Sequence, residues 1–395
     1  MMAPTIMIIG AGPFQVPAIL EAQEMGYRVL AVDGNADALG LKLANYQYNI
    51  DLKDIEDCIQ VARERKIAGV FTVAAEVAVK TVAAVASALK LPGLTVESAE
   101  IATDKSRMRE CFEKHGVPSP KWRKCRKLEE ASAKSQEIGF PVVIKPADSA
   151  GSRGVSLVQN VGDVTAAFYG AAKHTTNSLI LVEEFMPGVE ISVEAFVHKG
   201  QVHILTLSDK VRTKPPYLLD LSVHFPSNQP AEIQKQARDV ATRGILACGI
   251  DNATIHMEQM ITPDGPKIVE FAARGAGFHV FTNMIHWVTG VNAVSELIKL
   301  SVNDKPDFTV TANRGCVLKF PQIKPGLVNS VSGLEEARRI PGVLNADIYV
   351  KPGDTIRPLT SGADRVCHII AFGKTRAEAE QIAECAENTL KIVTE

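Results

Sequence analysis

Residues 256–277 read HMEQMITPDGPKIVEFAARGAG, and this stretch determines the fold that we expect for the middle of the chain. Two apolar runs flank a cluster of Pro, Asp and Gly, which is typical of a β-hairpin. A three-residue loop over 263–265 places Glu258 directly opposite Glu270 on the neighbouring strand. A four-residue loop would instead place Phe271 opposite Glu258, so the loop length decides what this glutamate faces.

Alternation along the two strands separates a polar face from an apolar face. The polar face carries His256, Glu258, Glu270 and Arg274, with His256 opposite Ala272, and the apolar face carries Met257, Ile261, Val269 and Phe271. Two directly opposed carboxylates repel each other unless a cation lies between them. A hard divalent ion such as Mg²⁺, shared with a phosphate, is the natural candidate. The alternative is an exposed hairpin whose acids are solvated.

Length and composition predict a soluble protein of two or three domains. The 395 residues exceed what one hydrophobic core usually holds. A net charge of −2 indicates no general attraction to nucleic acid or to an anionic membrane, and no apolar run approaches the length of a membrane span. The seven cysteines are scattered without a CxxC pair, which favours reduced thiols in the cytoplasm over a zinc site.

The first hundred residues alternate between strands and helices. We expect strands over 5–9, 28–32 and 69–73, and helices over 14–25, 55–65 and 75–89. This order is typical of a doubly wound parallel sheet. The turn Gly10-Ala11-Gly12 and the later Asp33 suggest dinucleotide binding, but Gln15 occupies the place of the third glycine. A close structural turn is therefore favoured, and a small substrate at this strand end remains an alternative.

Two lysines mark the start of the central region. A helix capped by Thr103 or Asp104 begins near Lys105, where backbone N–H groups favour anions. A buried strand over 140–145 ends at Lys145 and runs into a loop rich in small residues. Such a loop lets backbone N–H groups approach a phosphate closely, although a plain hairpin turn is the alternative. Its candidate residues are Ser149, Gly151, Ser152, Arg153 and Gly154.

A second buried strand, over 179–184, ends in acidic residues and leads into a turn. Backbone groups near Glu184 and Met186 are free to pair with an adenine edge, and Glu190 is placed to accept from ribose hydroxyls. Residues 208–228 form a long polar segment with three prolines, typical of a functional lid. Within it, Lys210, Arg212 and His224 are candidate contacts for a substrate carboxylate, or simply a solvated surface.

The remainder of the chain completes the central unit and adds a small cap. We expect helices over 232–248 and 287–301, followed by strands over 316–320, 344–350 and 366–372 and a last helix over 375–389. The predicted architecture is α/β and α+β in three domains, 1–103, 104–305 and 306–395.

The ordered set of Lys105, Lys145 with its small-residue loop, Glu183–Glu190, the glutamate pair and Arg274 resembles the ATP-grasp superfamily of carboxylate–amine ligases. The resemblance is greatest to the carbamoyl-phosphate-synthase-like and L-amino-acid-ligase branches. It implies a Rossmann-like N-terminal domain, a central ATP-grasp fold and a small C-terminal α+β domain. It also implies a cytoplasmic enzyme that uses ATP and Mg²⁺, or Mn²⁺, and that is commonly a homodimer.

The resemblance assigns a role to each candidate residue. Lys105 and Lys145 contact ATP phosphates, the loop from Ser149 to Gly154 covers them, and Arg274 stabilises the acyl-phosphate stage. The adenine and ribose contacts are Glu183, Glu184, Phe185, Met186 and Glu190, and the magnesium ligands are Glu258 and Glu270. Family members commonly carry Asn where this chain has Ala272. A second metal is therefore held more weakly, or His256 or water replaces the amide.

The implied reaction activates a carboxylate as an acyl phosphate and joins it to an amine, with an amino acid as the favoured substrate. Two alternatives remain open. One is a purine-pathway or carbamoyl-phosphate-type ligase or carboxylase, and the other is a non-catalytic nucleotide-binding sensor. The acidic Glu21 and Asp33 in the first domain argue against phosphoribosyl substrates, and retention of both glutamates and Arg274 argues against a sensor.

Overall fold

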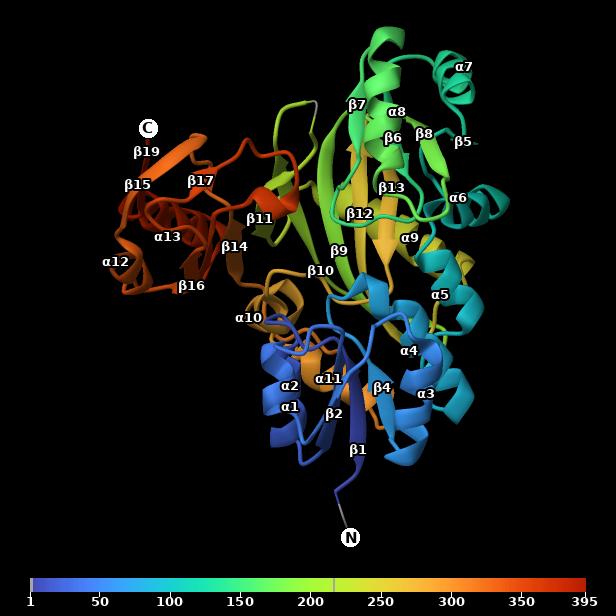
Figure 1. Cartoon of the computed structure of the whole chain (residues 1–395), viewed down its shortest axis with the longest axis vertical. Helices are drawn as coiled ribbons and strands as arrows, with labels where there is room; N and C mark the ends of the chain where they lie inside the picture. The colour runs from blue at the N-terminus through green and yellow to red at the C-terminus, as the bar shows by residue number, and fades with distance from the viewer. Residues whose placement is uncertain (1–2, 216) are drawn as a thin grey trace.

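The computed structural model describes residues 3–215 and 217–395. At the N-terminal end, drawn in blue in Figure 1, a parallel sheet has the strand order β3-β2-β1-β4. Its elements are β1 (Thr5–Ile9), α1 (Val16–Glu24), β2 (Arg28–Asp33), α2 (Leu39–Leu43), β3 (Tyr46–Asn49), α3 (Ile55–Glu64), β4 (Gly69–Phe71), η1 (Glu76–Ala78) and α4 (Val79–Leu89). The predicted βαβ order is confirmed, and α2 and β3 are additional elements.

A small antiparallel sheet, β5-β8-β6-β7, lies at the opposite end of the molecule in Figure 1. Helix α6 begins at Lys105 because the Asp104 carboxylate accepts hydrogen bonds from the backbone N–H groups of Ser106 (2.8 Å) and Arg107 (3.3 Å). The elements that follow α4 in the chain are α5 (Val96–Ala102), α6 (Lys105–Lys114), β5 (Trp122–Cys125), α7 (Leu128–Ile138), β6 (Val142–Pro146), β7 (Ser156–Val158), η2 (Val161–Asp163), α8 (Val164–Ala172) and β8 (Ile180–Glu184).

An eight-stranded sheet in the order β13-β12-β9-β10-β11-β14-β18-β16 forms the centre. Its strands are β9 (Val189–His198), β10 (Gln201–Arg212), β11 (Asp220–Phe225), β12 (Ala253–Thr262), β13 (Gly265–Ala272), β14 (Gly315–Lys319), β16 (Val343–Ile348) and β18 (Cys367–Gly373). Helix α9 (Ala231–Ala247) follows β11 in the chain, and η3 (Val280–Met284), α10 (Ile285–Thr289) and α11 (Ala293–Ser301) follow β13. The single helix predicted over 287–301 is wrong, because Gly290 in the left-handed region (φ 80°) ends α10 and Asn292 caps α11.

The C-terminal region shares this central sheet. Strands β14, β18 and β16 extend it, and the remaining elements form a three-stranded sheet with flanking helices. These elements are β15 (Gly326–Ser332), α12 (Leu334–Arg338), β17 (Thr355–Ile356), η4 (Gly362–Asp364), α13 (Arg376–Thr389) and β19 (Lys391–Thr394). The boundaries 1–103, 104–305 and 306–395 stay a prediction. None of the helices in the described part of the chain has the length and apolar character that a membrane crossing requires.

The hairpin of β12 and β13 has the predicted register at the glutamate pair, but its loop length differs from the prediction and a bulge compensates for the difference. Glu258 pairs with Glu270, but the loop is two residues, 263–264, because Thr262 pairs with Gly265. A bulge beside Glu258 adds the residue that the shorter loop lacks. The three-residue loop is therefore wrong, and so is the assignment of Val269 to the core. Between the bulge and the loop, the alternation of buried and exposed side chains in β13 is shifted by one residue. Ile268, and not Val269, is therefore the fully buried side chain.

The predicted lid over 208–228 is wrong, because most of it is two paired strands. β10 runs to Arg212 and β11 begins at Asp220, and the strands pair antiparallel with a bulge between Val211 and Arg212. A connection over 213–219 remains, and Pro216 within it lies outside the described residues. The prolines suggested a loop, but the alternating Ser222–Phe225 segment pairs on both sides, with β10 and β14.

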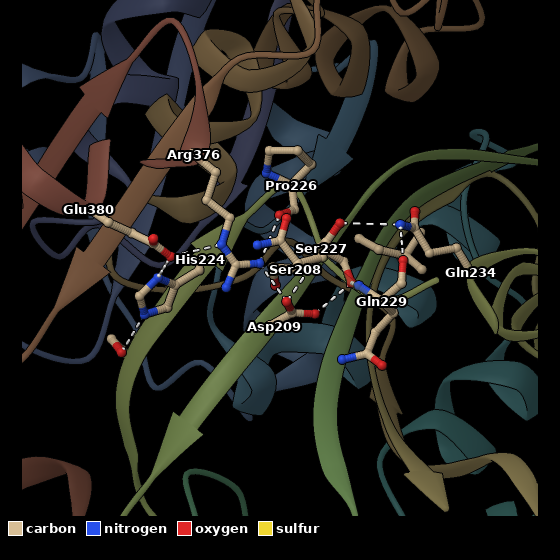
Figure 2. A network of polar contacts seen from close by, with 12 residues as sticks. Ser208, Asp209, His224, Pro226, Ser227, Gln229, Gln234, Arg376 and Glu380 are labelled. Atoms are coloured by element: carbon tan, nitrogen blue, oxygen red, sulfur yellow. Dashed lines mark hydrogen bonds and ion pairs between the residues drawn. The ribbon is translucent and has the colours of Figure 1, made fainter. Parts of the chain in front are cut away.

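A polar network fixes these strands to the last helix (Figure 2). Arg376 of α13 forms an ion pair with Asp209 of β10, donates to the Pro226 carbonyl at 3.0 Å and bonds Glu380 at 2.8 Å. His224 bonds the same Glu380, with 2.8 Å between Nδ1 and the carboxylate oxygen. The Arg376 and Asp209 side chains are largely buried, with 15% and 10% exposure. The C-terminal helix is thereby attached to the central sheet by charge as well as by packing.

Replacing Arg376 tests this attachment. Arg376→Gln leaves the Asp209 carboxylate largely buried without a cation, so we expect the free energy of unfolding to fall by about 2–4 kcal/mol. Urea unfolding followed by tryptophan fluorescence measures the loss. The matched control is Arg338→Gln, whose ion pairs are 41% or more exposed and should contribute less than about 1 kcal/mol. Equal losses in the two variants would contradict the role of the network.

Candidate active site

Two cavities meet between the small sheet and the central sheet. The first has a volume of about 100 Å³ and the second about 490 Å³. Their shared wall is made by Lys105, Ser149, Ser152, Arg153, Asp220, Glu258 and Glu270. The glutamate pair therefore lies between two compartments, of which the first is lined by strands of the small sheet.

Nearly all the residues selected from the sequence lie at these cavities. The first cavity is lined by Lys145, Glu183, Glu184, Phe185, Met186 and Glu190, and the second by Gly151 and Arg274. Gly154 is the exception, because it packs against α8, where an added Cβ would lie 3.1 Å from the Ala171 Cα. It keeps a structural role in the loop, with a φ of 74° that favours glycine.

A lysine neutralises each of the two opposed glutamates. Lys105 Nζ lies 3.1 Å from a Glu270 carboxylate oxygen and donates to the Ser149 carbonyl at 2.6 Å. Lys210 Nζ bonds Glu258 and lies 3.1 Å from Glu190 and 3.2 Å from Asp220. The cation that the opposed carboxylates require is therefore supplied, in this structure, by ammonium groups from α6 and β10.

Electrostatics in this cluster oppose the cost of burial. Burial raises the pKa of Glu258, but Lys210 and His256 hold that pKa well below its usual range. Burial lowers the pKa of Lys210, yet Asp220, Glu258 and Glu190 raise it well above its usual value. For Glu190 burial prevails and raises the pKa to about 7, with Glu258 and Asp220 adding to the effect. Glu258 is thus ionised and able to bind a metal ion.

The three basic candidates of the predicted lid have different positions. Lys210 and Arg212 reach the site, because Lys210 bonds Glu258 and the Arg212 guanidinium forms an ion pair with Glu190. They are held by carboxylates of the chain and are not free on a lid. His224 contacts Ser222 and Glu380 in the network of Figure 2 and lines neither cavity among the described residues, so its assignment to substrate is wrong.

His256 occupies the position across from Ala272, as predicted from the register. Its Nδ1 lies 2.6 Å from the buried carboxylate of Glu194, and its Nε2 lies 3.8 Å from Glu258. Burial lowers the pKa of His256, but Glu194 outweighs this effect and raises the pKa to about 9. His256 is therefore protonated at neutral pH and lies as a cation beside Glu258 in the wall of the second cavity.

Arg109 is a buried cation behind the site that the sequence analysis did not single out. It is fully buried on α6, one turn after Lys105, and donates two hydrogen bonds to Glu183 at 2.9 and 3.1 Å. Glu183 also lies 2.8 Å from Lys145 Nζ. Burial raises the pKa of Glu183, but the two cations lower it below its usual value. Glu183 therefore positions Lys145, and helical spacing after Lys105 is the signal in the sequence that points to Arg109.

The chemistry of these donors fits magnesium and a nucleotide. Two carboxylates on neighbouring strands are hard oxygen ligands, and Mg²⁺ usually takes its other ligands from phosphates and water. Lys105, Lys145 and Arg153 line the first cavity beside that pair, where they can contact phosphate oxygens. The turn 185–188 contributes to the wall of the same cavity. Its backbone passes close to the Ile261 carbonyl at Gly188 (φ 144°), where an added Cβ would lie 1.9 Å from the carbonyl oxygen.

Comparison with known proteins identifies the class. Residues 138–282 match the ATP-grasp domain, so the chain carries an ATP-grasp domain, as the sequence predicted. Residues 319–395 match the second C-terminal domain of L-amino acid ligases. ATP-grasp homologues of this kind are ATP-dependent carbon–nitrogen ligases that use ATP and Mg²⁺.

Individual relatives support the same class. Alanine–anticapsin ligase of Bacillus subtilis is 28% identical over 253 residues, which are 58% of this chain and 53% of the relative. The chain thus spans about half the length of that ligase. A formate-dependent phosphoribosylglycinamide formyltransferase of Geobacter metallireducens is 27% identical over 99% of this chain and 97% of its own length. The L-amino acid ligase structure from Bacillus licheniformis superposes over the whole of both chains, with a TM-score of 0.86 at 21% identity.

Freeing Glu258 from its lysine should create a metal site in the nucleotide-free protein. A metal ion must displace ammonium groups from both glutamates, so we expect weak Mn²⁺ binding by the unmodified protein. Lys210→Met should tighten this binding by about 10- to 100-fold, because Glu258, Glu190 and Asp220 then lack their shared cation. Calorimetric titration with Mn²⁺ measures the change. Lys214→Met, at an exposed position, is the control, and equal affinity in both variants would contradict the account.

The His256–Glu194 pair should make stability depend on pH. Because the pKa of His256 rises from 6.5 to about 9 on folding, its stabilisation is fully present below pH 6.5 and is lost as the pH passes about 9. We expect a loss of up to about 3 kcal/mol across this window. Urea unfolding at pH 6 and pH 10 measures it. His256→Gln should abolish this component, whereas the exposed control His286→Gln should retain it; an unchanged slope in His256→Gln would refute the assignment.

Proposed function

We propose that this chain is an ATP-dependent carbon–nitrogen ligase that activates a carboxylate as an acyl phosphate and joins it to an amine. The observation that carries this proposal is the shared wall of the two cavities, where Lys105, Glu258 and Glu270 face both compartments. ATP in the first cavity and a carboxylate in the second would meet at that wall. An amino acid is the favoured substrate, in keeping with the L-amino acid ligase match of the C-terminal region.

The chemistry divides into two steps. A carboxylate oxygen attacks the γ-phosphorus of ATP, the bond from phosphorus to the ADP oxygen breaks, and an acyl phosphate forms. The amine nitrogen then attacks the acyl carbon, phosphate leaves and the nitrogen loses a proton. Magnesium, when bound, offsets the negative charge of the phosphate oxygens.

Residues of the chain supply positioning and positive charge. Lys145, held by Glu183, and Lys105 contact the phosphates in the first cavity. Arg274 lines the second cavity and is fixed by Glu76 of the N-terminal lobe, at 3.0 Å between Nε and the carboxylate. Arg274 is placed to stabilise charge that grows as the acyl phosphate forms. Glu76 is therefore a positioning residue that links the N-terminal lobe to the reaction.

A purine-pathway ligase is the second candidate. The nearly full-length similarity to the formyltransferase of Geobacter metallireducens favours it. That reading requires the second cavity to bind a phosphoribosyl group. In the described residues of that cavity the predicted first domain contributes Ala74, Glu76, Ala102 and Thr103, which supply no cation, so such a phosphate would depend on arginines from the other regions. An amino acid substrate therefore has the stronger support. As the oligomeric state we propose a homodimer.

A screen for ADP release over amino acids, amines and bicarbonate tests the proposal. The unmodified protein should release ADP with an amino acid as carboxylate, and Glu270→Gln should lower kcat/KM by at least about 100-fold, because a neutral amide binds Mg²⁺ poorly. Glu335→Gln, which alters an exposed ion pair, is the matched control and should keep full activity. Full turnover in Glu270→Gln would overturn the metal assignment, and release only with phosphoribosyl amines would favour the second candidate.

A further inference from the structure

Arg365 brings a positive charge to the second cavity from the C-terminal region. It follows η4 directly and precedes β18, and it lines the cavity that also holds Arg274 and the glutamate pair. Its guanidinium carbon lies 3.7 Å from the Phe320 ring centre and 5.1 Å from that of Phe278. The two aromatic rings fix the plane of the guanidinium by cation–π contact.

The hydrogen bonds of Arg365 are incomplete. Its Nη2 donates to the Asp220 carbonyl at 2.8 Å, and its buried Nε has no acceptor among the described residues. No carboxylate of the described chain lies within 4.0 Å of it, whereas Arg109, Arg212 and Arg274 each have a carboxylate partner. A largely buried guanidinium without a counterion is costly, so this position favours an anion from outside the chain.

The proposed reaction brings a further anion into this cavity, and no residue has yet been assigned to bind it. The carboxylate to be activated must lie beside the glutamate pair and Arg274, because it attacks the γ-phosphate there. If the amine belongs to an amino acid, its own carboxylate stays unreacted and enters the same cavity. We propose that Arg365 binds this carboxylate of the amine-bearing substrate, which makes the acceptor an amino acid and not ammonia or a simple amine. This assignment rests on the ligase function proposed above.

The test compares one acceptor with and without its charge. With ATP and the carboxylate substrate saturating, ADP release is measured against an acceptor amino acid and against the carboxamide of the same amino acid. For Arg365→Gln we expect the KM of the amino acid to rise by about 30- to 100-fold, because a charge-assisted hydrogen bond is lost. The kcat, and the KM of the carboxamide, should stay within about threefold. Arg365→Lys should recover part of the affinity and carries the test if the Gln variant does not fold.

The control and the contrary outcomes separate this assignment from the proposed function. Arg357→Gln, eight positions earlier and exposed, should leave every constant unchanged. An unchanged KM for the amino acid in Arg365→Gln, or an equal rise for amino acid and carboxamide, overturns the assignment while the ligase function stands. A preference of the unmodified protein for simple amines also overturns it. If the unmodified protein releases no ADP with any pair, the proposed function fails first, and this assignment with it.

Discussion

The repulsion between Glu258 and Glu270 is the constraint on which the rest of the site depends. Their pairing in adjacent antiparallel strands brings two carboxylates together, and such an arrangement requires a cation. The chain supplies Lys105 from the first turn of α6 and Lys210 from β10. Both lysines reach the pair from elements far apart in the sequence. Each glutamate of the pair therefore has an ammonium partner from the chain, and a metal ion that binds between them must displace these lysines.

That rearrangement connects the three regions of the chain. Lys105 follows the linking helix α5, Arg274 is fixed by Glu76 of the N-terminal lobe, and Lys210 is next to Asp209, which Arg376 of the last helix holds. A change at the glutamate pair therefore reaches all three regions through direct contacts. The C-terminal region also supplies Arg365 to the same cavity. Through these links, residues of all three regions contribute to the cavity in which we propose that the reaction takes place.

Local patterns in the sequence were sufficient for the elements that bear the site. The alternation in 256–277 identified the paired glutamates, and Asp104 was a correct helix cap. The bulge beside Glu258 escaped prediction because a shorter loop and an extra residue give the same register. The lid was wrong because prolines and charges hid two strands whose pairing is set by distant segments. Arg109 was missed because its burial depends on Glu183, which lies 74 positions later.

When a nucleotide binds, a divalent ion should replace the lysines between Glu258 and Glu270. Anomalous diffraction from crystals grown with Mn²⁺ and ADP would detect this exchange. We expect a manganese peak within ligand distance of both carboxylates, with Lys105 moved from Glu270 onto a phosphate oxygen. Bound nucleotide with no manganese between these side chains, or with both lysine contacts intact, would contradict it.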